Sequence, residues 1–482
     1  MAVLLALLCV VPSADAQLFS GSAPFVPPGS GNAPSGGGPT GPATGTAGND
    51  TTPLVAADGP APEFRGLWVD AYREGFKSPE QVDRLLLDAR RANINALLVQ
   101  VRKRGDALYL RSLEPRTEDP DLVPGFDPLA YLIERAHNDG PRVEIHAWVT
   151  TTTIWGSEGK KPADPRHAFN QHGAGAPGRE DWLSRREDGA TWSRGYFLDP
   201  GHPDAAKYTT DVMLNLVREY DLDGLHLDYI RYPERADGLS WGYNETAIAE
   251  FNQQTGRTGR PAGNDPAWTQ WRRDRVTQLV RGIYQGALAI KPNVRISAAV
   301  IPWGDGPKTD ADWQKTAAYS SVYQDWRSWL EEGIVDQVMP MNYFRESANQ
   351  GAWFDRWVAW QRDHGYGRQV IPAVALYLND PAESIAQIKR ALTATSPNGT
   401  KVAGVALYSY AATQRSTAGD DTVTTRAQGE AMWAALTEPG PANGNQPPFA
   451  GRTLPPSVAS KGSAAPSSNM IFRSPGQEVP RP

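Results

Sequence analysis

Eight short runs rich in β-branched and apolar residues alternate with longer amphipathic stretches between residues 64 and 410. Several runs, such as ALLVQVR (96–102), are almost continuously apolar, as expected of parallel strands that are buried on both faces. The eight runs are residues 64–70, 96–102, 143–149, 223–230, 295–301, 337–343, 369–376 and 402–410. A strand followed by a helix, repeated eight times, predicts a closed (β/α)₈ barrel of the α/β class rather than an open doubly wound sheet.

The stretches between the runs carry apolar residues at helical spacing. The first, SPEQVDRLLLDARRAN (78–93), begins with Ser78 as a candidate N-cap and Pro79 at the first helical position. The others are expected near residues 127–139, 204–220, 268–290, 318–332, 351–364, 382–394 and 424–436. The first strand is not followed by a GxGxxG turn, which disfavours a dinucleotide-binding fold.

Composition separates one folded domain from two extensions. All 16 tryptophans lie between Trp68 and Trp433, whereas Gly, Pro, Ala, Ser and Thr dominate both ends, which cannot bury enough apolar surface to fold. Residues 1–16 resemble a signal peptide ending at Ala14-Asp15-Ala16, with a short peripheral helix as the alternative. The expected organisation is therefore a signal peptide (1–16), a disordered linker (17–62), the barrel (63–439) and a disordered Pro-rich tail (440–482), in a secreted, periplasmic or envelope protein.

Charge and cysteine content exclude several classes of function. The net charge is -6 and no long run of Lys and Arg is present, which argues against a nucleic-acid partner. The one cysteine, Cys9, lies in the signal-like segment, so a cleaved chain would have no disulfide, thiolate nucleophile or Cys-ligated zinc. No stretch after that segment is long and apolar enough to span a membrane. We expect no cofactor, and the sequence leaves the oligomeric state open.

Two connections between expected elements are unusually long. Residues 150–200 follow the third strand and residues 231–267 follow the fourth. Both come after the carboxyl ends of strands, the face on which barrel enzymes build their active sites. Long loops of this kind are usually functional in a compact domain, although an inert insertion is the alternative.

Asp228, in the segment DGLHLDYIRYP, is the first candidate for a catalytic residue. Side chains two apart on a strand share a face, so Asp228 and His226 should point into the barrel and Leu225 and Leu227 away from it. A carboxylate in a barrel interior is costly unless it is paired or used in the reaction. The alternative is that Asp228 only anchors a buried ion pair with an arginine, either Arg231 or Arg102.

The same alternation groups polar residues of the neighbouring strands. Gln100 and Arg102 on the second strand, and His146 and Trp148 on the third, should line the pocket beside Asp228. A strand histidine that is simply buried and hydrogen-bonded is the competing interpretation for both His146 and His226. The full set of candidate substrate-binding residues is Arg65, Asp70, Gln100, Arg102, His146, Trp148, His226, Arg231, Trp303, Asn342, Tyr343 and Tyr408.

Glycoside hydrolysis typically needs a second carboxylate, so that one can be the general acid and the other the nucleophile or base. The candidates at or after strand ends are Glu346, Asp305, Asp70 and Glu74. We rank Glu346 first because it follows the sixth strand, roughly across the barrel mouth from the fourth, then Asp305 and then Asp70. Six tryptophans in or near these loops could stack on sugar rings: Trp148, Trp155, Trp182, Trp192, Trp241 and Trp303.

The segments DGLHLDYIRYP, FRGLWVD, VQVRKRGDALY, FDPLAYLIERAH, VEIHAWV, YFLDPGHPDAAKY and VMPMNYF resemble, in order and spacing, the glycosyl-hydrolase-like family 10. The resemblance covers about residues 63–436. It implies a (β/α)₈ barrel that hydrolyses glycosidic bonds of a polysaccharide, such as bacterial cell-wall glycan, without a required metal. Asp228 matches the family's acidic residue after the fourth strand, and Asp199 matches the "LDP" that closes the long loop. Asp223 and Gly224 match the opening of the fourth-strand pattern. Many members carry a second acidic residue where this chain has Tyr229.

Two other functions remain open at this stage. A non-catalytic barrel that binds glycans would keep the aromatic residues but lack a working acid pair. A metal-dependent hydrolase would use His146, His226 and Asp228 as ligands. The first strand lacks an H-x-H pair, which argues against the metal site.

Overall fold

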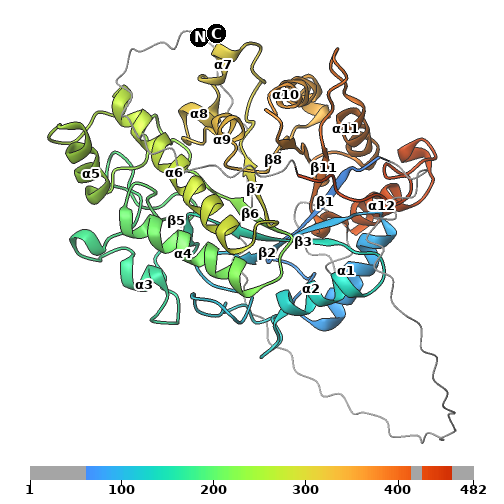
Figure 1. The fold of residues 1–482 in the computed structure, drawn as a ribbon, viewed down its shortest axis with the longest axis horizontal. Coiled ribbons are helices and arrows are strands. Elements are labelled where there is room, and N and C mark those ends of the chain that lie inside the picture. Colours follow the sequence, from blue (N-terminus) through green and yellow to red (C-terminus); the bar gives the residue numbers. More distant parts are fainter. Residues whose placement is uncertain (1–60, 414–425, 459–482) are drawn as a thin grey trace, which may run out of the picture. The chain divides into compact units, whose positions relative to one another are not determined.

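The computed structural model describes residues 61–413 and 426–458 and contains a parallel sheet at its centre (Figure 1). The strand order is β10-β11-β1-β2-β3-β6-β7-β8-β9. The strands are β1 (Phe64–Val69), β2 (Ala96–Arg102), β3 (Glu144–Thr150), β6 (Gly224–Asp228), β7 (Arg295–Val300), β8 (Gln337–Pro340), β9 (Gln369–Val370), β10 (Ala373–Ala375) and β11 (Gly404–Tyr408). Seven of the eight predicted runs each overlap one of these strands, and the run 369–376 contains two, β9 and β10.

The sheet closes through the divided strand. β9 pairs with β8, whereas β10 pairs with β11, and only Ile371 and Pro372 separate β9 from β10. A further parallel bridge joins Met341, just after β8, to Ala373 in β10. The two short strands therefore occupy one position between β8 and β11, and the predicted (β/α)₈ barrel is confirmed. Proline at position 372 cannot donate a backbone hydrogen bond, which accounts for the break.

Helices surround the sheet (Figure 1). Those that follow the barrel strands are α1 (Pro79–Arg91), α2 (Pro128–Asn138), α4 (Pro203–Glu219), α6 (Pro266–Ile290), α9 (Trp326–Glu332), α10 (Gly351–Asp363), α11 (Pro381–Thr393) and α12 (Arg426–Thr437). The first four and α11 begin at proline, and the residue before each proline accepts a hydrogen bond from the first turn through its side chain. A proline at this position costs no hydrogen bond, and the side-chain cap satisfies an otherwise unpaired N–H.

One predicted helix is interrupted. The stretch 318–332 forms α8 (Ala317–Ser320) and α9, and Tyr323 between them has a φ of 56°. The next residue, Gln324, inserts its side chain among the strand ends, where Oε1 accepts from Ile301 N at 2.9 Å and Nε2 donates to Ala299 O at 3.2 Å. These buried backbone groups need partners, so the chain leaves the helix to provide them.

The two long connections contain structure of their own. The first holds an antiparallel pair, β4 (Thr153–Trp155) and β5 (Tyr196–Phe197), with the short helix α3 (Ala168–His172) between them. The second contains α5 (Glu245–Thr255). Three of the candidate stacking tryptophans pack in a small core within the first connection: Trp155, Trp182 and Trp192. A fourth, Trp241, is 1% exposed and donates its Nε1–H to Glu234 O, so these four rings serve packing.

Apolar residues form one layer inside the barrel and another between sheet and helices. The inner layer includes Phe64, Trp68, Leu98, Trp148 and Met339. The outer layer contains Leu225 and Leu227 of β6, the outward orientation that strand alternation predicts for them.

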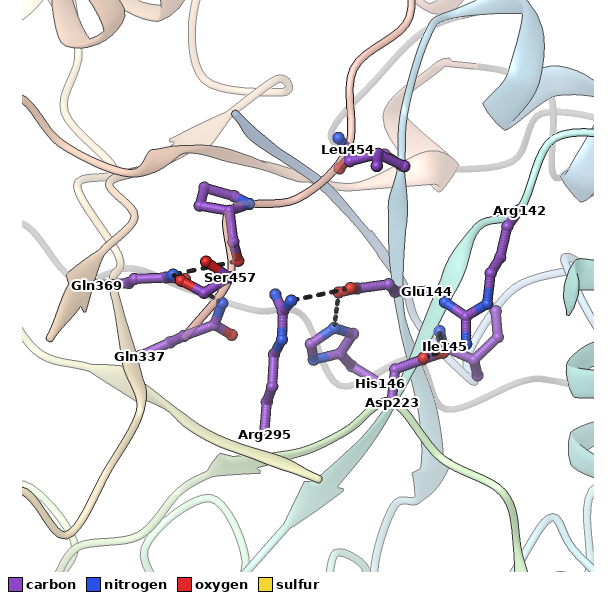
Figure 2. A network of polar contacts seen from close by, with 12 residues as sticks. Arg142, Glu144, Ile145, His146, Asp223, Arg295, Gln337, Gln369, Leu454 and Ser457 are labelled. Carbon is purple, nitrogen blue, oxygen red and sulfur yellow. Dashed lines mark hydrogen bonds and ion pairs between the residues drawn. The ribbon is translucent and has the colours of Figure 1, made fainter. Parts of the chain in front are cut away.

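The amino ends of the strands meet in a polar network (Figure 2). Glu144, the first residue of β3, lies 3.1 Å from Arg295, the first of β7, and 3.1 Å from His146. On the other side, Gln337 Nε2 donates to Gln369 Oε1 at 2.8 Å, and these are the first residues of β8 and β9. Charged and amide side chains therefore fill this end of the barrel, and several of them bind one another.

The chain after α12 crosses this end of the barrel. Gln369 Nε2 donates to Ser457 O at 3.0 Å, Asn95 Nδ2 to Thr453 O at 3.0 Å, and Phe449 is 2% exposed. The prediction that the domain ends at Pro439 is corrected here, because residues 440–458 pack against the barrel through backbone carbonyl groups and one buried ring. Residues 459–482 lie outside the described residues, as do the predicted signal peptide and all but the last two residues of the predicted linker.

Asp199, in the segment that closes the first long connection, is a fully buried carboxylate. Its Oδ1 accepts from Tyr232 Oη at 2.9 Å and from Gly201 N at 2.8 Å, but Oδ2 accepts no hydrogen bond from residues 61–413 or 426–458. Burial raises the pKa of Asp199 to about 6, against the lowering effect of these donors and of the Arg272 charge.

This pKa predicts a pH-dependent cost in stability. In the unfolded chain the carboxyl ionises near pH 4, so between about pH 4 and pH 6 the folded state holds a proton that the unfolded state has lost. The contribution of Asp199 to stability is therefore fully present below about pH 4 and is lost as the pH rises to about 6. We expect the stability of Asp199→Asn relative to wild type to improve by about 2 to 3 kcal/mol from pH 4 to pH 7, as measured by urea unfolding. A difference independent of pH would contradict this account.

Candidate active site

Asp228 is the last residue of β6 and lies at the carboxyl end of the barrel. Its Oδ2 accepts a hydrogen bond from Trp148 Nε1 at 3.1 Å, and its Oδ1 accepts from the backbone N of Tyr229 at 2.7 Å. The side chain is 6% exposed. Burial raises the pKa of Asp228, while the nearby Arg231 charge and these two donors act to lower it. The result is a fixed carboxyl group whose proton is held more tightly than in water.

Asp70 follows β1 and is the second buried carboxyl at this end. It is 7% exposed, and its Oδ1 accepts from Tyr72 N at 2.9 Å. Burial raises the pKa of Asp70 too, and the charges of Arg73 and Lys77 oppose that rise. The neighbouring backbone N of Ala71 donates to Gln100 Oε1 at 3.0 Å, which ties this strand end to β2.

Tyr408, the last residue of β11, links the two carboxyl groups. Burial raises the pKa of its hydroxyl well above the usual range, and the charges of both Asp70 and Asp228 raise it further. The charges of Asp70 and Asp228 therefore both act on one phenol, which stays protonated and can donate a hydrogen bond. Asp70, third in the sequence ranking, is the carboxyl group that shares a neighbour with Asp228.

Aromatic rings surround this phenol. The ring centroid of Tyr408 lies 5.6 Å from that of Tyr343, 6.0 Å from Tyr377 and 6.3 Å from Trp148. Pyranose rings present apolar C–H faces that pack well on such surfaces. With Trp303, which lies against Arg231, Trp148 is one of two stacking candidates from the sequence that contact this site.

Glu346 and Asp305 do not lie beside Asp228. Glu346 is in a 3₁₀ turn (Glu346–Ala348), and its carboxylate accepts from Arg390 Nη2 at 2.6 Å and Gln387 Nε2 at 2.8 Å, both on α11. Asp305 is 42% exposed and forms an ion pair with Arg356 of α10. Both groups are neutralised in the helix layer, which argues against the sequence ranking that put them ahead of Asp70. Glu74 is exposed.

Arg102 has a structural partner instead of a pocket position. Its guanidinium forms an ion pair with Glu114, with Nε to Oε2 and Nη2 to Oε1 both at 2.7 Å, and both side chains are 0% exposed. The register of β2 against β3 shifts between Gln100 and Arg102. A bulge of this kind breaks the alternation on which the prediction relied.

The histidines lie deeper in the barrel than predicted. His146 faces Glu144 at the amino end, and a Cβ added at Gly224 would come within 2.1 Å of its Nδ1, so the glycine is required for this packing. His226 is fully buried, where its Nε2 accepts from Trp68 Nε1 at 3.2 Å and its Nδ1 lies 2.9 Å from Ser297 Oγ. The two imidazoles and Asp228 thus have separate partners at different depths, contrary to the arrangement that a shared metal ion needs. Among residues 61–413 and 426–458, no group of three His, Cys, Asp or Glu side chains is placed to hold a metal ion.

Two further candidates lie outside the site. Arg65 binds Glu63 at 2.7 Å and donates Nη1 to Gly451 O at 2.7 Å, at the amino end of β1. Asn342 is 0% exposed and exchanges amide hydrogen bonds with Gln361 of α10. The sequence shows that both residues lie near the ends of strands. It does not show that Arg65 lies at the amino end of the barrel or that Asn342 faces the helix layer.

The sequence analysis missed Tyr72, Arg104 and Tyr377 and gave Tyr229 no role. Tyr72 is 49% exposed, and Arg104 lies over its ring at 5.4 Å. Tyr377 and Tyr229 both contribute to the surroundings of Tyr408. Each follows a barrel strand by one to three residues, and that position is the signal that could have identified them.

The structure is thus a (β/α)₈ barrel with two buried carboxyl groups and several tyrosines at its carboxyl end. Residues 63–391 match the model of the family Glycosyl hydrolase-like 10, and the chain belongs to this family.

Two curated relatives support the assignment. The chain is 28% identical to glycosyl hydrolase YngK of Bacillus subtilis over 359 residues, which are 68% of this chain and 65% of that protein. It is 27% identical to glycosyl hydrolase DigH of Escherichia coli (strain K12) over 294 residues, 57% of this chain and 60% of that protein. The match thus spans less than two thirds of either relative.

A solved structure supports the fold. The catalytic domain of β-amylase from Paenibacillus polymyxa superposes with a TM-score of 0.52 at 11% identity, covering 77% of this chain and 96% of that domain. In addition, none of the helices in the described ranges has the length and apolarity that a membrane crossing requires.

Proposed function

We propose that the chain is a glycoside hydrolase that cleaves a polysaccharide at the carboxyl end of the barrel by carboxylate acid/base chemistry. The observation that carries this proposal is the pair Asp70 and Asp228, both buried, both with a raised pKa and both acting on the Tyr408 hydroxyl. Glycosidases use such a pair across the scissile bond.

Asp228 is assigned the general-acid role. Burial raises the pKa of both carboxyl groups, which favours the protonated form that a general acid needs. Asp228 has fewer groups that oppose its raised pKa than Asp70 has, since Asp70 is near both Arg73 and Lys77. Asp228 then donates its proton to the leaving-group oxygen, and ionised Asp70 activates water or attacks the anomeric carbon. Tyr408 donates a hydrogen bond to the sugar or to the ionised partner.

The proposed substrate is bacterial cell-wall glycan. YngK and DigH are both named glycosyl hydrolases of bacteria, and the family resemblance of the motifs includes this class of substrate. Such a substrate lies outside the cytoplasmic membrane, so the proposal includes export directed by the signal-like residues 1–16.

The test is direct. Purified protein should release new reducing ends from cell-wall glycan strands but not from starch or cellulose, with products identified by mass spectrometry. The anomeric form of the first product, read by NMR, reports whether water or Asp70 attacks. If none of these glycans is cleaved but one is bound, the second candidate function, a glycan-binding barrel without catalysis, replaces the first.

A further inference from the structure

Arg231 lies three residues after Asp228, at the turn that leaves β6. Its guanidinium carbon is 4.6 Å from the centroid of the Tyr229 ring and 5.6 Å from that of Trp303. The residue is 8% exposed. Contact with two aromatic rings fixes the plane of a guanidinium and leaves its N–H edge to bind other groups.

The guanidinium of Arg231 lacks a hydrogen-bond partner in the described part of the chain. Its Nε is buried without a hydrogen bond, and no ion pair or side-chain hydrogen bond joins it to residues 61–413 or 426–458. Other buried arginines have protein acceptors: Arg102 pairs with Glu114, Arg65 pairs with Glu63, and Arg272 donates to Ser240 Oγ and Trp241 O. A buried guanidinium with an unpaired N–H is costly, so its retention beside the site points to an anionic ligand that accepts from it.

The backbone holds Arg231 in place before any ligand arrives. Its N–H donates to Tyr229 O at 2.9 Å, and its carbonyl accepts from Thr152 Oγ1 at 3.0 Å. Tyr229 adopts a φ of 50°, which turns the chain sharply after Asp228. A preorganised side chain loses little entropy when it binds a ligand.

We propose that Arg231 binds a carboxylate carried by the substrate sugar next to the scissile bond, so that the site selects an acidic glycan. The planar N–H edge of Arg matches the two oxygens of a carboxylate. This inference rests on the proposed function of the site. It also adds a step to it, because the bound carboxylate neutralises the cation that lowers the pKa of Asp228 and so favours the protonated acid.

A competing role for Arg231 is to lower the pKa of Asp228 without binding the substrate. The two roles differ in what they do to different substrates. Loss of a carboxylate-binding residue harms only acidic substrates and acts on KM, whereas loss of a tuning residue changes the pH profile of kcat on every substrate.

The experiment compares peptide-free cell-wall glycan strands with the same strands after conversion of their carboxylates to neutral methylamides. Wild type should have a KM about 10- to 100-fold lower for the acidic strands, and Arg231→Gln should lose that preference while its KM for the amide strands is unchanged. Arg231→Lys, which retains the charge but not the planar edge, should be intermediate. Arg235→Gln, at an exposed arginine four residues away, is the matched control and should behave as wild type.

Each alternative result has a defined meaning. Equal KM values of wild type for the two strands, or an equal loss on both in Arg231→Gln, would overturn the inference. If wild type cleaves neither strand, the binding of both strands is measured by calorimetry. Tighter binding of the acidic strand by wild type, with no such preference in Arg231→Gln, supports the inference although the proposed function fails. Equal binding of the two strands by wild type overturns the inference. If Arg231→Gln does not fold, Arg231→Lys supplies the same comparison.

Discussion

Asp228→Asn is expected to lower kcat on the cleaved glycan by about 1,000-fold or more while leaving glycan binding within a few-fold of wild type. Asparagine has nearly the same shape as aspartic acid and can still accept from Trp148 Nε1, but it cannot donate the proton that the leaving group needs. Turnover should be measured by release of reducing ends, and binding by calorimetry with the same strands.

The matched control is Glu346→Gln. The sequence analysis ranks this carboxylate first as the partner of Asp228, but in the structure it accepts hydrogen bonds from Arg390 and Gln387. Its replacement should leave kcat within a few-fold of wild type. Unchanged turnover in Asp228→Asn would remove Asp228 from the catalytic role, and a large loss in Glu346→Gln would restore the sequence ranking.

Arg102→Met is expected to cost about 3 to 5 kcal/mol in the free energy of unfolding. It leaves Glu114, which is fully buried, without its cation and with Tyr208 Oη, at 2.7 Å, as its remaining side-chain donor. Burial alone would lower the pKa of Arg102, yet the charge and hydrogen bonds of Glu114 outweigh burial and raise it, so Glu114 stabilises the charged guanidinium. Denaturant unfolding measures the loss.

Two comparisons isolate the cause. Arg91→Met breaks an ion pair with Glu438 whose side chains are 53% and 55% exposed, and it should cost less than about 1 kcal/mol. The double variant Arg102→Met/Glu114→Leu removes both buried charges and should recover part of the stability. If Arg102→Met lowers the free energy of unfolding no more than Arg91→Met does, the buried ion pair contributes less to stability than expected.

The barrel and the inward orientation of Asp228 could be predicted because both depend on local patterns. Runs of apolar residues fix strands, and their alternation with helical spacing fixes the topology. Within a strand, alternation gives the face, and it correctly turned Asp228 inward and Leu227 outward. The end of a strand is equally readable when polar residues follow it.

Strand alternation does not predict how deep in the barrel a side chain lies or which residues it contacts. His146 is on the expected face but lies at the amino end, against Glu144. Arg102 depends on a bulge in β2 and on Glu114, which lies in a loop twelve residues later. The displacement of Glu346 depends on Arg390, which is 44 residues away in sequence. Contacts between distant residues decide which carboxylates are free to react, and no local pattern encodes them.

The segment that crosses the amino end of the barrel has a consequence for how the protein is made. Gly451 O and Thr453 O accept hydrogen bonds from Arg65 and Asn95, across separations of 386 and 358 residues. Loop closure over such distances is slow compared with local pairing. Because a chain is synthesised from its first residue, the groups at the start of β1 and β2 wait for partners that are made last. The floor of the barrel is therefore completed only after nearly the whole domain has left the ribosome.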